Sequence, residues 1–146
     1  SSALLAQPNL PAIMKFAAKV LLRIKPDMSV DSGLDVKSIS RDPAEVERYV
    51  ADPLVHGKGT PALSHFMEVT VEAVQRDAGK LTLPLLMLCG DADPLVPYEG
   101  TKTFFANAGS ADKTLKIYAD NYHELHNDLD REQLFADETA WLLEHC

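Results

Sequence analysis

The chain has 146 residues, of which 46% are hydrophobic and 25% are charged, a composition typical of a globular domain with a real core. Its formal net charge of −8 argues against binding to nucleic acid, because phosphate groups attract basic surfaces, and against strong attraction to an anionic membrane. No apolar run approaches the roughly 20 residues that span a bilayer. The two cysteines, Cys89 and Cys146, do not make a disulfide framework.

The first half, residues 1–79, is predicted to consist of helices and loops. A first helix over residues 13–24 carries one apolar stripe of Ile13, Phe16, Ala17, Val20, Leu21 and Ile24. Asp42 and Pro43 start a second, short helix, because aspartate caps free backbone N–H groups and proline suits the first helical position. A third helix runs from Thr60 to about Gly79, with an apolar stripe of Leu63, Phe66, Met67, Thr70, Val71 and Val74. No strand is expected in this half.

The second half, residues 80–146, alternates strands and helices. Residues 83–89 are apolar at both odd and even positions, which is typical of a strand buried between the helix layers of a parallel sheet. A helix over residues 98–108, a second strand over residues 115–119 and a helix over residues 131–144 follow. This order predicts an α/β fold whose two strands are parallel neighbours.

Local signals define the ends of these elements. Pro84 cannot donate a ladder hydrogen bond, so we place it before the first strand. Asp130 and Gln133 predict a start resembling a capping box for the last helix. Phe104 and Phe105 are expected to face inward, and the apolar face of the last helix consists of Leu134, Phe135, Trp141 and Leu142.

Two strands alone do not make a stable sheet. A strand that is apolar on both faces also needs neighbours on both of its edges. We therefore expect this chain to be the C-terminal half of a larger α/β domain.

Acidic residues and a histidine follow the two predicted strands. Gly90-Asp91-Ala92-Asp93-Pro94 comes directly after the first strand, and Asn121-Tyr122-His123-Glu124 comes after the second. Ligands bind beyond the carboxyl ends of parallel strands, so these loops are expected to meet there. An aspartate that accepts a hydrogen bond from His123 would orient it as the proton acceptor of a hydrolase triad. The nucleophile elbow, Gly-x-Ser-x-Gly, is absent from the sequence, so we expect the nucleophile before Ser1.

Each of these residues also has a structural interpretation. Asp91 and Asp93 are both good turn formers, and either fits the acid. His123 and His126 are three residues apart, as in some metal sites, but no third ligand accompanies them, so no metal is expected. Cys89 ends an apolar strand and is interpreted as a small buried hydrophobic residue. The remaining aspartates and glutamates are interpreted as solvated surface.

Four stretches resemble the monoacylglycerol lipase-like group of the α/β-hydrolases, which is also described as serine aminopeptidase-like or lysophospholipase-like. They are Ser40-Arg41-Asp42-Pro43 with Tyr49 and Asp52-Pro53-Leu54-Val55 (cap segment), residues 81–90 (seventh strand), residues 90–96 (acid loop), and residues 113–118 followed by 122–124 (last strand and histidine loop). The resemblance runs nearly end to end. It places the catalytic acid on Asp93 and the catalytic histidine on His123.

The resemblance implies a serine hydrolase that cleaves acyl esters similar to monoacylglycerol or lysophospholipid. Its Ser-Asp-His triad would take the serine from an N-terminal half, and no cofactor is implied. A helical cap, residues 1–79, would cover an apolar acyl tunnel. Candidates to line this tunnel are Phe66, Met67, Leu95 and Val96, with core packing as the alternative for each. We expect a cytoplasmic protein, with transient membrane contact through the cap.

Two alternatives stay open. Dehalogenases and epoxide hydrolases of the same fold use an aspartate nucleophile with a similar C-terminal half, so the elbow residue decides between them. The other alternative is a non-catalytic chain that is stabilised by association. The isolated chain is expected to be inactive in each case, because it lacks a nucleophile and an oxyanion hole.

Overall fold

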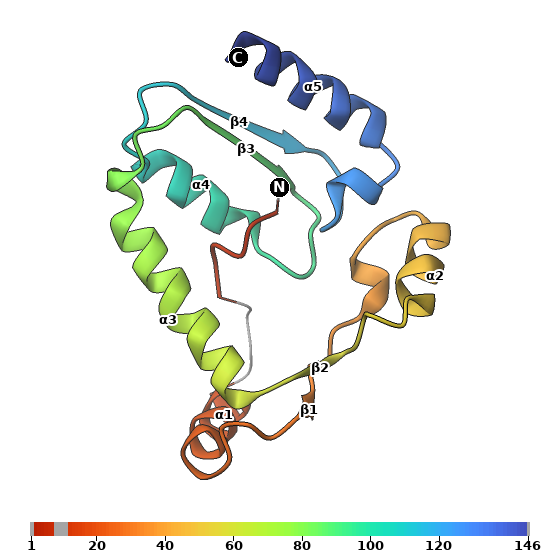
Figure 1. The fold of residues 1–146 in the computed structure, drawn as a ribbon, viewed down its shortest axis with the longest axis vertical. Helices are drawn as coiled ribbons and strands as arrows, with labels where there is room; N and C mark the ends of the chain where they lie inside the picture. Colours follow the sequence, from red (N-terminus) through yellow and green to blue (C-terminus); the bar gives the residue numbers. More distant parts are fainter. Residues whose placement is uncertain (1, 8–11, 146) are drawn as a thin grey trace.

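Two parallel strands form the centre of the structure, a computed structural model that describes residues 2–7 and 12–145 (Figure 1). Strand β3 (Leu85–Gly90) pairs with β4 (Lys113–Tyr118), with Leu85 opposite Lys113 and Gly90 opposite Tyr118. The predicted parallel pairing is confirmed, and β3 begins directly after Pro84 as expected. Ser1 and Cys146 lie outside the described residues.

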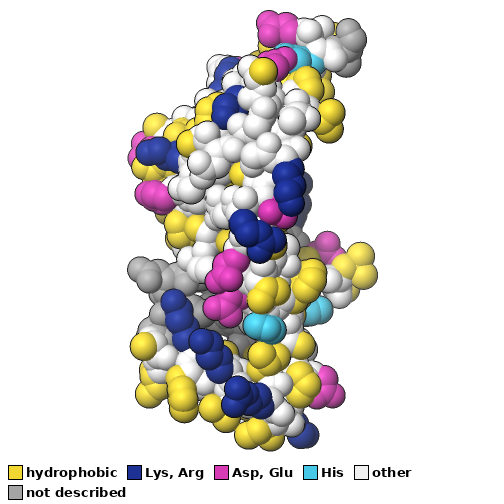
Figure 2. Space-filling model, turned by 90° about the vertical axis from the view of Figure 1, so that its left-hand side faces the viewer, with side chains coloured by type: hydrophobic (Ala, Val, Ile, Leu, Met, Phe, Trp, Pro, Cys, Tyr) yellow, Lys and Arg dark blue, Asp and Glu magenta, His cyan; other side chains and the backbone are white. Residues whose placement is uncertain are grey.

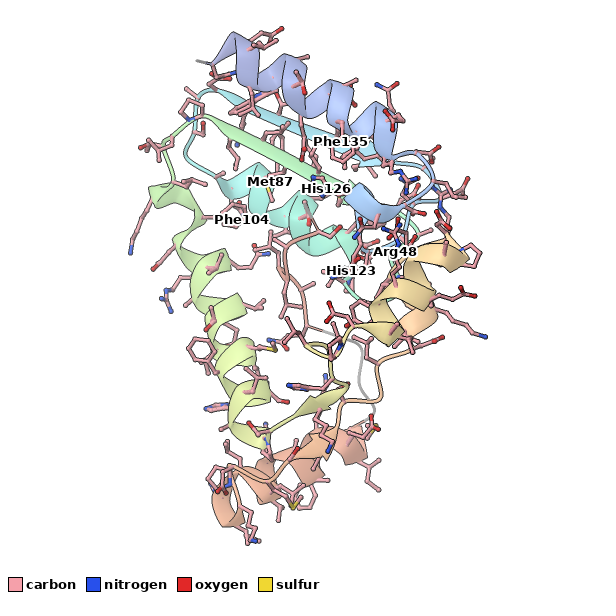
Figure 3. The ribbon with its side chains drawn as sticks, turned by 45° about the vertical axis from the view of Figure 1, so that its right-hand side comes forward. Arg48, Met87, Phe104, His123, His126 and Phe135 are labelled. Atoms are coloured by element: carbon pink, nitrogen blue, oxygen red, sulfur yellow. The ribbon has the colours of Figure 1, made fainter. Side chains whose placement is uncertain are left out.

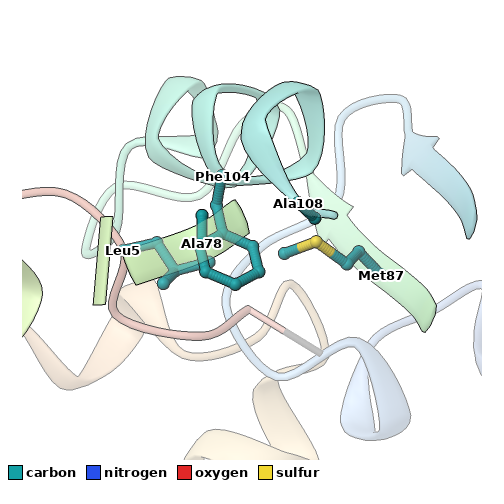
Figure 4. Close-up of a cluster of buried hydrophobic side chains, with 5 residues drawn as sticks. All are labelled: Leu5, Ala78, Met87, Phe104 and Ala108. Atoms are coloured by element: carbon teal, nitrogen blue, oxygen red, sulfur yellow. The ribbon is translucent and has the colours of Figure 1, made fainter. Parts of the chain in front are cut away.

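Side chains of β3 alternate between two apolar clusters, one on each face of the strand pair. Met87 joins Leu5, Ala78, Phe104 and Ala108 in the first cluster (Figure 4). Leu88 joins Leu125 and Leu134 in the second. The first cluster packs α4 (Tyr98–Asn107) against the sheet, and the second packs α5 (Arg131–Glu144) against it. The prediction of a strand buried on both faces is confirmed.

The described part of the first half contains three α-helices and one small ladder. Helices α1 (Ala12–Ile24) and α3 (Pro61–Asp77) contact each other at one end of the molecule, and α2 (Pro43–Ala51) lies apart from them (Figure 1). Strand β1 (Val30–Asp31) pairs antiparallel with β2 (Lys58–Gly59). The expectation that this half has no strand is therefore wrong. A two-residue ladder leaves no alternating pattern in the sequence, so hydrophobic periodicity cannot reveal it.

The predicted start of α2 is confirmed, whereas that of α5 is only partly right. Asp42 Oδ1 accepts a hydrogen bond from Ala44 N at 2.9 Å. Helix α5 begins at Arg131, but Asp130 makes no side-chain cap. Its Oδ2 instead accepts a hydrogen bond from Arg41 Nη2 at 2.6 Å, because a guanidinium competes well for a carboxylate.

Several predicted apolar faces are exposed. None of the residues of α1 is buried, and Phe66 on α3 is 63% exposed. On the predicted apolar face of α5, Leu134 is buried, whereas Phe135 and Leu142 are exposed. Within residues 2–7 and 12–145, no helix is both long and apolar enough to cross a bilayer.

Candidate active site

The loop after β3 fixes the carboxylate of Asp93. Its Oδ1 atom accepts hydrogen bonds from the backbone N–H groups of Leu95 at 2.8 Å and Val96 at 3.0 Å. The side chain is 3% exposed. One carboxylate oxygen therefore shapes the loop after β3 (residues 91–97, the acid loop). The other oxygen, Oδ2, faces the loop after β4 (residues 119–130, the histidine loop).

His123, on the loop after β4, meets that second oxygen. Its Nδ1 atom lies 2.8 Å from Asp93 Oδ2, so the predicted hydrogen bond is present. An ionised carboxylate can only accept, so Nδ1 carries the proton and Nε2 is the basic nitrogen of the neutral ring. The hydrogen bond to Asp93 raises the pKa of His123 above its ordinary value of 6.5, and burial opposes this rise only in part.

Asp91 has a different role from Asp93. Its Oδ1 atom accepts a hydrogen bond from Asp120 N at 2.7 Å. Asp120 has a φ of 61°, in the left-handed region that few residues other than glycine adopt without cost. Asp91 thus stabilises the strained entry to the histidine loop.

Gly90 allows the acid loop and the histidine loop to meet. A Cβ atom on this residue would lie 2.1 Å from the carbonyl oxygen of Asn121, far inside van der Waals contact. Any side chain there would push the backbone of the histidine loop away from β3. The glycine at the end of the strand is therefore a steric requirement of the site.

The histidine loop also contains a buried ion pair that sequence analysis missed. Asp128 is fully buried, so its interpretation as solvated surface is wrong. Its carboxylate accepts a hydrogen bond from Arg41 Nε at 3.0 Å. Burial raises the pKa of Asp128, but hydrogen bonds from Tyr122 N, Leu129 N and Arg41 outweigh burial, so the pKa lies below its ordinary value. Arg41 belongs to the Ser40-Arg41-Asp42-Pro43 motif that resembles the cap segment of the family. Nothing in the sequence, however, indicates that its partner is Asp128, 87 positions away.

Neither His126 nor Cys89 takes part in the Asp93–His123 pair. His126 Nε2 lies 2.9 Å from Glu138 Oε1, and the ring packs near Phe135 of α5, on the side of the loop away from His123 (Figure 3). Cys89 is buried as expected, and burial is the main reason that the pKa of its thiol rises to about 11. Among the described residues, no three His, Cys, Asp or Glu side chains are grouped so that they could hold a metal ion.

Comparison with known proteins identifies the family. The family model described as serine aminopeptidase, S33, matches residues 1–130. The chain belongs to this family of α/β-hydrolases. It is 33% identical over 141 residues to monoacylglycerol lipase of Mycolicibacterium smegmatis and 38% identical over 131 residues to monoglyceride lipase of Homo sapiens. These alignments cover 96% and 88% of the chain.

The fold of this α/β-hydrolase chain is also that of a solved relative. The crystal structure of Paleococcus ferrophilus monoacylglycerol lipase superposes with a TM-score of 0.91 at 36% identity, and the match covers 100% of the chain and 58% of that structure. The curated relatives are matched over 50% and 43% of their own length, so the chain spans about half the length of the lipases it resembles. The predicted monoacylglycerol lipase-like α/β fold is confirmed.

The four predicted tunnel residues lie in two places in this α/β-hydrolase chain. Leu95 and Val96 are next to the acid, since their N–H groups donate to Asp93. Val96 is buried, and Leu95 is half-buried. Phe66 and Met67 are exposed on α3.

Proposed function

We propose that this chain supplies the acid and the histidine of a serine hydrolase that cleaves acyl esters. The observation that carries the proposal is the hydrogen bond between His123 Nδ1 and Asp93 Oδ2, at the carboxyl ends of two neighbouring parallel strands. The nucleophilic serine and the oxyanion hole would come from an N-terminal half. We use the term assembled enzyme for this chain together with such a half.

The proposed chemistry follows from the tautomer of His123. Its free Nε2 would accept the proton of the serine hydroxyl as the serine oxygen attacks the ester carbonyl carbon. Asp93 would stabilise the imidazolium that forms. The imidazolium would then give its proton to the departing alcohol, which leaves an acyl-enzyme. A water molecule activated by the same Nε2 would release the fatty acid.

The proposed substrates are monoacylglycerol or lysophospholipid-like esters. The names of the relatives support this class: two are monoacylglycerol or monoglyceride lipases, and a third, 28% identical, is phospholipase YtpA of Bacillus subtilis. We propose residues 1–79 as the cap, with Phe66, Met67, Leu95 and Val96 lining the acyl tunnel. The position of Leu95 and Val96 beside Asp93 and the apolar surface of α3 support this assignment. The serine hydrolase family match favours serine over an aspartate nucleophile.

A complementation assay tests this proposal. The chain alone is expected to hydrolyse p-nitrophenyl butyrate no faster than buffer, because it lacks a nucleophile and an oxyanion hole. Addition of an N-terminal half that carries the serine elbow should restore turnover of this ester and of a monoacylglycerol. An elbow with serine replaced by alanine is the matched control. Turnover by the chain alone would contradict the proposal.

We further propose that α1 makes transient contact with a membrane. Lys15, Lys19 and Arg23 are spaced four residues apart and share one face of the helix. Large apolar side chains are exposed beside them, among them Phe16 at 69%. Figure 2 shows basic side chains in a row next to hydrophobic ones at the end of the molecule that carries α1. This combination is typical of helices that lie in the membrane interface.

Vesicle binding tests this contact. The chain is expected to bind phosphatidylcholine vesicles more tightly when they contain phosphatidylglycerol, because each basic side chain near an anionic surface contributes about 1 kcal/mol. Lys19→Glu should weaken that binding about tenfold or more, since it removes one attraction and adds one repulsion. Lys80→Glu, in an exposed lysine beyond α3, is the control. Equal losses in the two variants would contradict a specific role for α1.

A further inference from the structure

The loop that carries His123 has an apolar anchor on one side only. It runs from β4 to α5 and contains the short helix η3 (Leu125–Asn127). Leu125 is fully buried against Leu88 and Leu134 and anchors the loop after His123. Before His123, the buried residue is Asn121, which is polar. Its position, and hence the approach of the backbone to His123, depends on hydrogen bonds.

A segment of the first half provides those bonds. Residues 39–41, which we call the strap, cross the histidine loop. Glu124 N donates to Ile39 O at 2.8 Å, and Ser40 Oγ donates to Asn127 O at 2.7 Å. Arg41 Nη2 donates to Asn121 Oδ1 at 2.7 Å. The strap therefore bonds to the loop both before and after His123.

The guanidinium of Arg41 reaches the residue next to His123 through Asp128. It bonds to the carboxylate of Asp128 through Nε, and the backbone N–H of Arg41 donates to the same carboxylate at 3.0 Å. The other hydrogen bonds of Asp128 include one from Tyr122 N, the residue before His123, at 2.7 Å. Asp128 is fully buried, and the hydrogen bonds from Tyr122 N, Leu129 N and Arg41 together hold its pKa below the ordinary value, so that it stays ionised and keeps this bond.

We propose that Arg41 is a positioning residue for His123: bonded to Asn121 and Asp128, it fixes the backbone over residues 121–124 so that the imidazole meets Asp93. The inference rests on the proposed role of His123 as the base. Arg41 itself bonds neither His123 nor Asp93, so it acts through the loop. The consequence is that the first half of the chain sets the geometry of a side chain in the second half.

Two variants weaken this arrangement in different ways. Arg41→Lys keeps a positive charge near Asp128 but loses the planar fork that bonds Asp128 and Asn121 together. Asn121→Ala removes one acceptor and leaves the Arg41–Asp128 pair intact. Arg131→Lys is the matched control, because Arg131 pairs with Glu45 at 3.1 Å and links α5 to α2 without bonding residues 121–124 through its side chain.

The first readout is the ring of His123, followed by ¹⁵N NMR titration of this chain assembled with an N-terminal half whose elbow serine is replaced by alanine. Asp93 and Glu124 are the charged side chains that raise its pKa, and none of the variants alters them. In Arg41→Lys and in Asn121→Ala, the pKa of His123 should fall toward 6.5, because the bond to Asp93 loosens. In Arg131→Lys it should stay at the native value. If the pKa of His123 stayed at its native value in both test variants, the inference would be overturned.

The second readout is kinetic and uses the assembled enzyme. The test variants should lower kcat about 10- to 100-fold, since a small misplacement of a catalytic group has this effect, and should change KM by less than about twofold. A role in folding alone would instead lower the thermal stability and leave the pH profile of kcat native, which would overturn the inference. The NMR readout needs no turnover. If His123→Ala left turnover intact, the proposed function would fail while the titration still tested Arg41.

Discussion

Replacement of His123 by alanine is expected to lower kcat of the assembled enzyme by at least about a thousandfold, as removal of the histidine does in other serine hydrolase triads. The physical reason is the loss of Nε2, the atom that would take the proton of the serine. KM should change little, because the imidazole does not line the proposed acyl tunnel. Steady-state kinetics on p-nitrophenyl butyrate measure both quantities.

The matched control for this prediction is His126→Ala. His126 lies in the same loop, but its Nε2 bonds to Glu138 of α5 rather than to the acid loop. Its removal should leave kcat within a few-fold of the native value. Equal losses in the two variants would assign the effect to the loop as a whole and not to the base.

Replacement of Asp93 by asparagine is expected to lower kcat by about 10⁴-fold, the effect of this change in a serine protease triad. The amide oxygen of asparagine can still accept from Leu95 N and Val96 N, so the acid loop should keep its shape. The amide nitrogen, however, would face His123 Nδ1 as a donor and favour the wrong tautomer. Kinetics of the assembled variant, with circular dichroism as a check of folding, test this expectation.

Asp91→Asn is the matched control for the choice of acid. Asp91 bonds to Asp120 N and lies two positions from Asp93 on the same loop. Its amide variant keeps an acceptor oxygen, so the loss of kcat should be mild. A severe loss in Asp91→Asn together with a mild loss in Asp93→Asn would show that the acid is Asp91.

The Asp93–His123 pair predicts how stability and activity depend on pH. The hydrogen bond to Asp93 raises the pKa of His123 above 6.5, so the charged pair stabilises the folded chain fully below pH 6.5. This contribution is lost as the pH rises through the raised pKa of the folded state. Activity changes in the opposite direction, because only neutral His123 is a base, so kcat should rise over the same range.

Much of the C-terminal half is predictable from the sequence alone. The apolar run before Gly90 predicts β3, because only a strand covered on both faces combines such a pattern with that length. The positions of Asp93 and His123 then follow from the rule that the carboxyl ends of parallel strands lie at one edge. Local chemistry also predicts the start of α2, since Asp42 bonds an N–H group two residues away.

Contacts between distant parts of the chain are not predictable in this way. The strap contacts the histidine loop through Arg41 and Asp128, 87 positions apart, and neither the charges nor the periodicity specifies such a pair. The same contact explains why Asp130 does not cap α5 as predicted, because its carboxylate accepts a hydrogen bond from Arg41 instead. The short ladder between β1 and β2 is hidden for a related reason, since two residues are too few to show a pattern.

Covalent labelling of the assembled enzyme tests most directly whether this chain supplies the acid and base but not the nucleophile. Treatment with a fluorophosphonate probe, followed by intact mass measurement of each half, shows which half carries the adduct. We expect one adduct on the N-terminal half, formed slowly when this chain carries His123→Ala, and no adduct on the chain of 146 residues. An adduct on this chain, or labelling at the native rate without His123, would contradict the account.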